Sequence, residues 1–226
     1  GLAQQFELLK QKLFAEGLFE SGKKLAVPVR PRKVAVITGH GSAACADILS
    51  SLEESQAPLD LYLCYSLVQG AQAVDDLLDA LQAATRLRPD VILLSRGGGS
   101  LEDLWPFNEE KLVRAIAACQ IPIVSAVGHE VDTTLCDLVA DYRAITPTAG
   151  AQFIASGWLA SLQELKNLRH RLLAQSPQSA MQRLRNRLHQ AESRLVQAPL
   201  DLLSQTKAKL LRCANSLLRY GPAVSL

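Results

Sequence analysis

The sequence predicts an α/β protein: a parallel sheet flanked by helices, followed by a long helical coiled-coil arm. Between residues 33 and 140, short apolar runs of the kind that form buried strands alternate with amphipathic helical segments. This β-α-β-α order is typical of a parallel sheet with helices on both faces. After residue 150 the apolar residues recur at spacings of three, four and seven, which indicates a coiled coil or a long helical hairpin.

The expected elements follow in chain order. A lead-in helix over residues 3–16 ends at Gly17, and a linker rich in proline and basic residues continues to residue 32. Strands are expected at residues 33–38, 59–65, 90–95 and 121–127. Helices are expected at residues 43–52, 73–87, 108–119 and 132–140. The domain over residues 33–150 is therefore predicted to be Rossmann-like.

The arm is expected over residues 151–226. Its first helix, residues 148–175, would extend about 40 Å at about 1.5 Å per residue and so leave the globular core. Pro177 and Pro199 are expected to break or kink the helices. Because the arm's periodic side chains are expected to pack mainly with each other, the α/β domain should fold without them. The sequence lacks a clear domain end, so we expect it to be a piece of a longer protein.

The composition is that of a soluble globular protein. Of 226 residues, 48% are hydrophobic and 20% charged, and no apolar run approaches the length of a membrane span. The first twenty residues are amphipathic and contain acids, so we expect them to be neither a signal nor a transit peptide. The five cysteines are scattered without CxxC spacing, which favours reduced core residues of a cytoplasmic protein over a metal or disulfide framework.

Charge is distributed unevenly along the chain. Residues 1–33 hold seven Lys/Arg and three Asp/Glu, a net +4. Residues 34–150 hold six and sixteen, a net −10, and residues 151–226 hold eleven and three, a net +8. Basic flanks of this kind suit a phosphate backbone or an acidic protein surface. A net +8 on one helical arm favours a polyanionic partner over a merely solvated helix face.

Unusual residues gather where the expected strands end. The first strand leads into "TGHGSAACAD", the third into "RGGGSLED" and the fourth into "GHEVD". Because open parallel sheets bind ligands outside the carboxyl ends of their strands, these three loops predict a site on one rim of the sheet.

The loop after the third strand has the features of an anion-binding site. Gly97, Gly98 and Gly99 allow the backbone N–H groups to turn toward one point, and Ser100 can cap the segment. Arg96 adds a planar fork that matches two phosphate oxygens. The glycines alone indicate only a tight turn, but an arginine directly before them favours phosphate binding.

A histidine and an aspartate follow the fourth strand. His129 comes after Gly128, and Asp132 lies three residues on, so a helical turn would bring the two side chains together. Histidine suits proton transfer near neutral pH, and a carboxylate can orient it. Thr133 stands where an HExxH zinc motif needs its second histidine. The alternative is a purely structural histidine–carboxylate pair.

The other polar residues near this rim keep two interpretations. Asp47, in the helix after the first strand, is a solvated acid when considered alone. Glu102, Asp103 and Trp105 either support the site or simply cap and pack a turn. His40 lies between two glycines and is either functional or structural.

Three segments together carry a family resemblance. "SRGGGSLEDLWPFN", "IPIVSAVGHEVDTTLCDLVADYRAITPTAGA" and "PRKVAVITG" with "SAACADIL" resemble the large subunit of exodeoxyribonuclease VII. The resemblance implies a bacterial, cytoplasmic nuclease that degrades single-stranded DNA from both ends to oligonucleotides, as one large subunit with several copies of a small helical subunit. By motif match, the catalytic positions correspond to Asp47, Arg96, His129 and Asp132.

The sequence departs from the family pattern in three places. "GHGSAA" stands where the family commonly has Ser-Pro-Thr-Gly, and "RAITP" replaces Arg-Ala-Pro-Thr-Pro. The family's N-terminal domain that binds single strands is not among these residues. The details of the loop over residues 39–42 therefore cannot be carried over from the family.

The residues and the resemblance together predict a phosphodiester hydrolase. Arg96 and the glycine N–H groups would hold the scissile phosphate, His129 would act as general acid or base, and Asp132 would orient it. Asp47 would position water or a cation. Two aspartates on one rim can support Mg²⁺ with waters, but the sequence does not decide whether a metal is used. The alternative is a non-catalytic nucleotide- or nucleic-acid-binding module with a coiled-coil scaffold arm.

Overall fold

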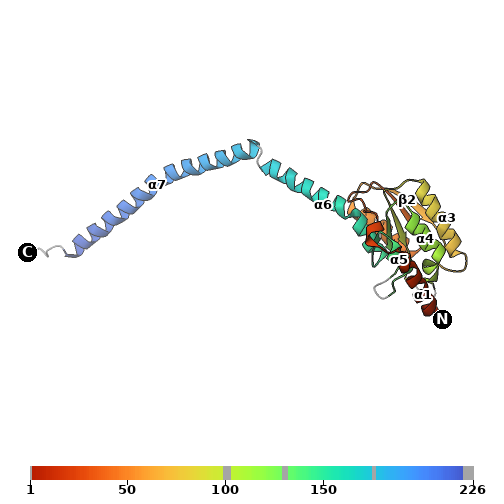
Figure 1. Cartoon of the computed structure of the whole chain (residues 1–226). Helices are drawn as coiled ribbons and strands as arrows, with labels where there is room; N and C mark the ends of the chain where they lie inside the picture. The colour runs from red at the N-terminus through yellow and green to blue at the C-terminus, as the bar shows by residue number, and fades with distance from the viewer. Residues whose placement is uncertain (1, 99–102, 129–131, 175–176, 221–226) are drawn as a thin grey trace, which may run out of the picture. The chain divides into compact units, whose positions relative to one another are not determined.

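The computed structural model describes residues 2–98, 103–128, 132–174 and 177–220 (Figure 1). The contacts divide the chain into two compact units, Gly1–Glu164 and Leu165–Leu226. The first unit contains the sheet and all the predicted site residues. The predicted domain boundaries at residues 33 and 151 stay a prediction.

The sheet has five parallel strands in the order β2-β1-β3-β4-β5. They are β1 (Lys33–Thr38), β2 (Asp60–Tyr65), β3 (Val91–Ser95), β4 (Ile123–Ala126) and β5 (Tyr142–Arg143). The four expected strands are confirmed. The fifth was missed because it pairs only two residues, Tyr142 with Val124 and Arg143 with Ser125, and so short a segment has no period to detect.

The first unit's helices follow the expected order. They are α1 (Leu2–Ala15), α2 (Ala43–Ser55), α3 (Ala73–Arg86), α4 (Glu110–Ala118), α5 (Leu135–Val139) and α6 (Pro147–Ala174), with 3₁₀ turns η1 (Ser21–Lys23) and η2 (Trp105–Asn108). Gly17 follows α1 in a left-handed conformation with φ +72°, as expected for a residue that ends a helix.

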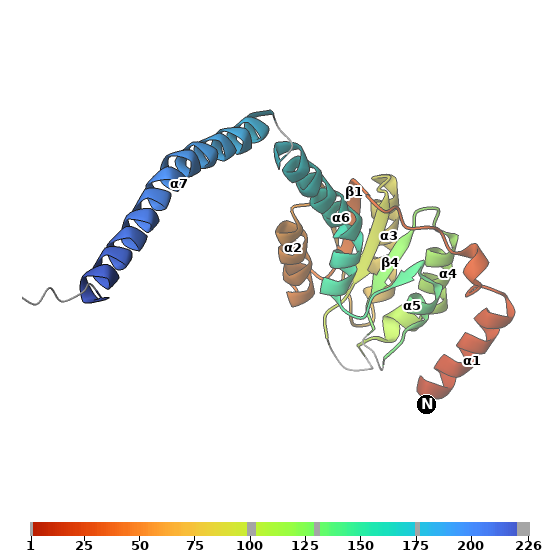
Figure 2. The same cartoon turned by 90° about the vertical axis from the view of Figure 1, so that its left-hand side faces the viewer.

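Helices cover both faces of the sheet (Figure 2). Successive strand residues point to opposite faces, so Ile92 and Leu94 join one core while Val91 and Leu93 join the other. The first core packs against α1, α3, α4 and α5, and the second against α2 and α6. The strands β1, β3 and β4 are mostly apolar because helices cover both of their faces.

The basic linker before β1 is held along the amino end of the sheet. The Asp90 carboxylate accepts hydrogen bonds from the backbone N–H groups of Arg32 and Lys33, at 2.7 and 2.9 Å. These bonds, with the positive charges beside them, lower the pKa of Asp90. Asp141 accepts from the N–H groups of Leu25 and Ile123, at 2.6 and 2.7 Å. Two carboxylates therefore fix a segment whose composition alone indicates a flexible linker.

The first half of α6 belongs to the α/β core. Ala151, Ile154 and Ala155 are at most 1% exposed and pack with β1, β3 and β4. The Trp158 indole donates to the Pro31 carbonyl at 2.7 Å. At Gly157 a Cβ would lie only 1.8 Å from the Val29 carbonyl oxygen. The expectation that the arm's residues pack mainly with each other is wrong here, because the helix begins against the sheet.

Two substitutions in α6 should have different effects on the free energy of unfolding, because only the first half of the helix is buried. Ile154→Ala should lower the free energy of unfolding by about 2–5 kcal/mol, because it leaves a cavity in the core. Leu165→Ala, on the same helix but at a side chain that is 62% exposed, should change it by about 0.5 kcal/mol or less. Chemical denaturation of both variants measures the difference. Equal effects would contradict the placement of the first half of α6 in the core.

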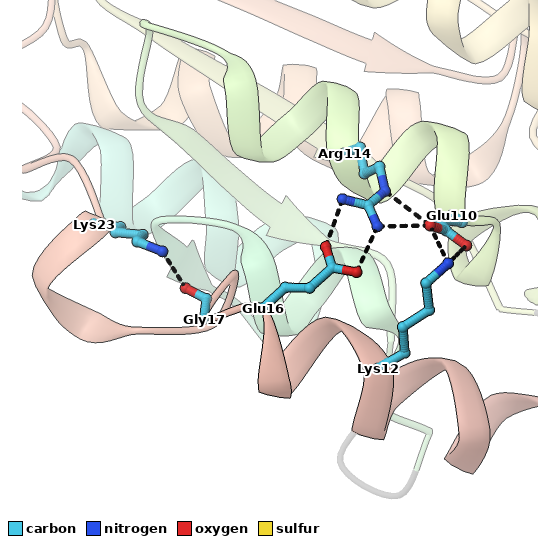
Figure 3. Close-up of polar contacts among 6 residues, drawn as sticks. All are labelled: Lys12, Glu16, Gly17, Lys23, Glu110 and Arg114. Atoms are coloured by element: carbon cyan, nitrogen blue, oxygen red, sulfur yellow. Dashed lines mark hydrogen bonds and ion pairs between the residues drawn. The ribbon is translucent and has the colours of Figure 1, made fainter.

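Ion pairs join α1 to α4 (Figure 3). Arg114 forms a bidentate pair with Glu16, at 2.7 and 2.9 Å, and also contacts Glu110 at 2.7 Å. Lys12 donates to both carboxylate oxygens of Glu110, at 2.8 and 2.9 Å. These hydrogen bonds lower the pKa of Glu16 and of Glu110. With Leu13 fully buried beneath them, they fix the lead-in helix on the sheet's helical layer.

The contribution of this network should depend on pH. Both carboxylates have a lowered pKa in the folded state, so their stabilisation is present above the ordinary value of 4.5 and is lost as the pH falls through the folded pKa. Arg114→Met should therefore lower the melting temperature at pH 7 by at most about 4 °C, since exposed pairs are weak. Lys111→Met, an exposed neighbour, is the matched control. A deficit that persists unchanged at pH 3 would contradict the ionic origin.

The second unit contains the end of α6 and the long helix α7 (Pro177–Tyr220). The expected interruption at Pro199 is wrong as a break, because α7 continues through it. Strong helix formers such as Leu, Lys, Gln and Ala dominate the following turns and offset the lost hydrogen bond. The periodic leucines are exposed rather than packed with each other: Leu165, Leu168, Leu172, Leu184, Leu188, Leu195, Leu203 and Leu210.

All five cysteines are free thiols. Cys45 and Cys136 are buried, and burial raises the pKa of both thiols. Cys213 is exposed on α7 and is not the core residue that the sequence predicted, because α7 has no core to enter. None of the helices within the described ranges has the length and apolarity to span a bilayer.

Candidate active site

The predicted site lies where the chain leaves two neighbouring strands toward opposite faces. β1 leads to α2 on one face of the sheet, and β3 leads to η2 and α4 on the other. Between two such strands the loops diverge and leave a crevice at their carboxyl ends, where open α/β sheets bind ligands. Arg96 and Gly97 directly follow β3 at this point.

The loop after β3 lies against the first turn of α2. A Cβ on Gly97 would lie 3.7 Å from the Ala44 Cβ and 3.9 Å from its backbone nitrogen. Ser42 caps this helix, and its hydroxyl accepts from the Cys45 N–H at 3.2 Å. The positive end of the α2 dipole therefore faces the same crevice as Arg96. Gly98 is also described, whereas Gly99 and Ser100 lie outside the described residues. The anion-binding turn of backbone N–H groups over residues 97–100 therefore stays a prediction.

Arg96 is the most unusual side chain of the site, because it is charged yet only 3% exposed. Its Nη2 lies 3.4 Å from the Asp103 carboxylate and 3.5 Å from the Gln69 side-chain oxygen. Its Nη1 is buried and has no hydrogen-bond partner within the described residues. An unpaired buried donor costs free energy, so this position suits an anion whose oxygens accept the unused hydrogen bond of the guanidinium.

The structure gives Arg96 two side-chain partners, one of which the sequence had singled out as a possible supporting residue. Asp103, expected as a supporting residue, forms its ion pair. Gln69 comes from the loop after β2, 27 residues earlier in the sequence, and only the strand order brings it to Arg96. Ser95 is fully buried, and its hydroxyl also has no partner among the residues described here.

Asp132 lies at the carboxyl end of β4, half-buried. A Cβ on Gly128 would lie 2.1 Å from the Asp132 carbonyl oxygen and 2.5 Å from an Asp137 carboxylate oxygen, so only glycine fits. The buried Asp137 accepts from the Ser125 hydroxyl at 2.6 Å and from the Thr134 N–H at 2.9 Å, and it completes a capping box at α5. Asp137 therefore fixes the turn that carries Asp132, and the Thr-x-x-Asp spacing of Thr134 and Asp137 is the sequence signal that could have indicated its capping role.

The remaining candidates are less constrained. Asp47 is exposed one turn after the residue that meets Gly97, and it makes no hydrogen bond or ion pair with other described residues. His129 and Glu102 lie outside the described residues. No group of three metal-binding side chains forms among the residues that the structure describes. His40 packs edge-on against Tyr65, with ring centroids 4.7 Å apart, at the β2 side of the rim.

Two cavities lie beside the N-terminal segment, one against α1 and one against the residues that follow it. One of about 240 Å³ lies beside Asp132, and its lining includes Phe6, Leu104, Trp105, Asn108 and Thr133. The other, of about 320 Å³, is lined by Lys23, Lys24 and Arg114. It lies at the amino end of β4 near Asp141, away from the carboxyl rim. Its Arg114 is already paired with two glutamates, so only the smaller cavity adjoins the candidate chemistry.

A buried, incompletely paired arginine at the strand crevice defines this chain as an α/β protein with a candidate anion-binding site. Comparison with known families gives the particular family. The chain belongs to the family described as exonuclease VII, large subunit, which matches residues 18–223.

Curated relatives carry the name exodeoxyribonuclease 7 large subunit. The protein from Rhodopirellula baltica is 48% identical over 186 residues, covering 80% of this chain and 42% of its own length. The protein from Proteus mirabilis is 43% identical over 227 residues, covering 96% of this chain and 49% of its own. The chain therefore spans about half the length of the curated relatives that it matches.

Proposed function

We propose that this chain is the catalytic part of an exonuclease that hydrolyses phosphodiester bonds of single-stranded DNA from both ends and releases oligonucleotides. The observation that carries the proposal is Arg96: it is buried at the strand crevice, and its Nη1 has no partner in the described part of the chain. A DNA phosphate has the charge and the two oxygens that such a fork binds. Membership of the exonuclease VII large-subunit family supports the same substrate.

The proposed mechanism divides the chemistry among the rim residues. Arg96 and the neighbouring backbone N–H groups neutralise the scissile phosphate as negative charge builds on it. His129 acts as the general acid or base, taking a proton from the attacking water or giving one to the leaving oxygen. Asp132 orients the imidazole and stabilises its charged form. Asp47 positions the attacking water from the exposed side of α2. The alternative role of Asp47 is to hold a cation. No step of this mechanism depends on a metal.

The arm is proposed to recruit the small helical subunits. The exposed leucine stripe of the second unit has the spacing of a coiled-coil seam, and residues 151–226 carry a net charge of +8. Helices with apolar seams and acidic flanks would complement both features. We therefore propose that the coiled coil predicted for the arm forms between the arm and such subunits.

The rival is a non-catalytic nucleic-acid-binding module with a scaffold arm. Labelled single-stranded and duplex DNA should be incubated with the full-length large subunit reconstituted with its small subunit, once with magnesium and once with chelator. We expect oligonucleotide products from the single strand and few from the duplex. Binding of the single strand without any product under either condition would favour the scaffold.

A further inference from the structure

We propose that the cavity beside Asp132 binds one nucleobase of the single strand, stacked between Trp105 and Phe6, next to the bond that is cut. This inference rests on the proposed function and adds a substrate-positioning subsite to it. Trp105 and Phe6 are the positioning residues. The lead-in helix α1 thereby becomes a wall of the active site.

The cavity has the size and lining of a site for a single base. Its volume of about 240 Å³ is below the range of about 300–1,000 Å³ that encloses drug-sized ligands, so it suits one planar base and not a dinucleotide. Two aromatic rings and Leu104 supply apolar surface. Asn108 and Thr133 supply polar groups at its edge. A planar, mostly apolar ring with a polar perimeter matches this lining.

Trp105 is held in one orientation. Its indole N–H donates to the Glu109 carboxylate at 3.0 Å, and the neighbouring Leu104, Pro106 and Phe107 of the η2 turn are buried beneath it. The ring itself is only half-buried, so one part remains available to a ligand. A rigid aromatic surface loses little entropy when a base stacks on it, and base–aromatic stacking is independent of sequence. That independence suits an enzyme that degrades any single strand.

Phe6 is placed by contacts at the other end of its helix. The carboxyl-terminal end of α1 is fixed on α4 by two ion pairs (Figure 3). Lys12 pairs with Glu110, and Glu16, the residue directly after the helix, pairs with Arg114. The amino-terminal half then lies along η2 and the turn at Thr133, where Phe6 enters the cavity lining. These ion pairs are too exposed to contribute much stability, but they set the position of a wall of the site.

Charge and position favour a base over other occupants. Asp132 and Glu7 also line the cavity, and two carboxylates would repel a phosphate. Asp132 lines the cavity and is also a proposed catalytic residue, so the cavity is continuous with the reaction centre. The phosphate is accommodated instead at Arg96, directly after the neighbouring strand β3. A nucleotide that spans these two places would present its phosphodiester bond to the residues between them.

The test removes one base from the substrate. End-labelled single strands carrying one abasic nucleotide should be cleaved by the full-length large subunit reconstituted with its small subunit, and the products mapped to each bond. For the parent enzyme we expect one bond, at a fixed spacing from the abasic position, to be cut roughly 5- to 150-fold more slowly. Trp105→Ala should slow cleavage of the intact strand by a similar factor and should cause no further loss at the abasic position.

Two further variants separate positioning from folding. Trp105→Phe keeps an aromatic surface and should restore most of the rate. Leu8→Ala, at an exposed position of α1, the helix that carries Phe6, should leave the rate unchanged. Equal cleavage of intact and abasic strands by the parent would overturn the base-binding role. The base-binding role would also be overturned if Trp105→Ala slowed cleavage of the intact and the abasic strand by the same factor. A parent complex that cuts neither strand would instead overturn the proposed nuclease function, and the subsite with it.

Discussion

Arg96→Lys should reduce single-turnover cleavage of single-stranded DNA on the order of a hundredfold or more, with nearly unchanged binding. The substitution keeps the positive charge, so long-range attraction of DNA and the ion pair with Asp103 are preserved. A lysine ammonium cannot provide two parallel N–H donors, and the contact to the phosphate in the transition state is lost. A loss of about 2.7–4 kcal/mol is expected if this contact resembles one oxyanion-hole donor.

The measurement combines three readouts on the reconstituted complex: single-turnover cleavage, fluorescence anisotropy of a bound oligonucleotide and a thermal melt. Arg86→Lys is the matched control, because Arg86 is an exposed residue of α3 that belongs to no proposed site. Cleavage by Arg96→Lys within a few-fold of the parent would leave the phosphate role unsupported. A large fall in melting temperature would show that burial of Arg96 serves the fold instead.

His129→Ala should lower kcat by roughly 10²–10⁴-fold, the usual contribution of a general acid or base. Binding of the single strand should survive, because the phosphate contacts assigned to Arg96 remain. The pH–rate profile should also lose the limb that reports the histidine, which a purely structural role would leave in place. His170→Ala, an exposed histidine of α6, is the control for removal of an imidazole. Cleavage at the parental rate would contradict the assignment.

The sequence alone predicted four of the five strands, the helices of the first unit and the rim of the sheet at which the candidate site residues gather. Strand residues such as those of β1 and β3 form continuous apolar runs, and α3 has a clear amphipathic period; both are local signals. The parallel order then placed the loops after β1, β3 and β4 on one rim, as the structure confirms. Arg96 and Asp103 both belong to the segment after β3 that the sequence singled out, but their ion pair was not predicted.

Several features of the site could not be predicted in this way. Gln69 reaches Arg96 from the loop after β2, and Asp137 supports the turn of Asp132 by accepting from Ser125 on the neighbouring strand. The cavity beside Asp132 needs Phe6 from α1 to meet Trp105 from η2, almost one hundred residues later. Neither Gln69 with Arg96 nor Phe6 with Trp105 shares a local period or a motif, and no sequence pattern pairs Ser125 with Asp137. Each is a consequence of how the elements pack.

The sequence by itself determined the helices of the first unit, the four longer strands and the rim that carries the charged and glycine-rich loops, because these follow from side-chain periodicity and turn chemistry within a few residues. Only the tertiary structure decided that α6 begins inside the core, that the linker is held by Asp90 and Asp141, and that Arg96 is buried with one nitrogen unpaired among the described residues. Burial and partnership are properties of a site assembled from distant segments. They arise when the apolar faces of those segments leave water together, a condition that no single segment can specify.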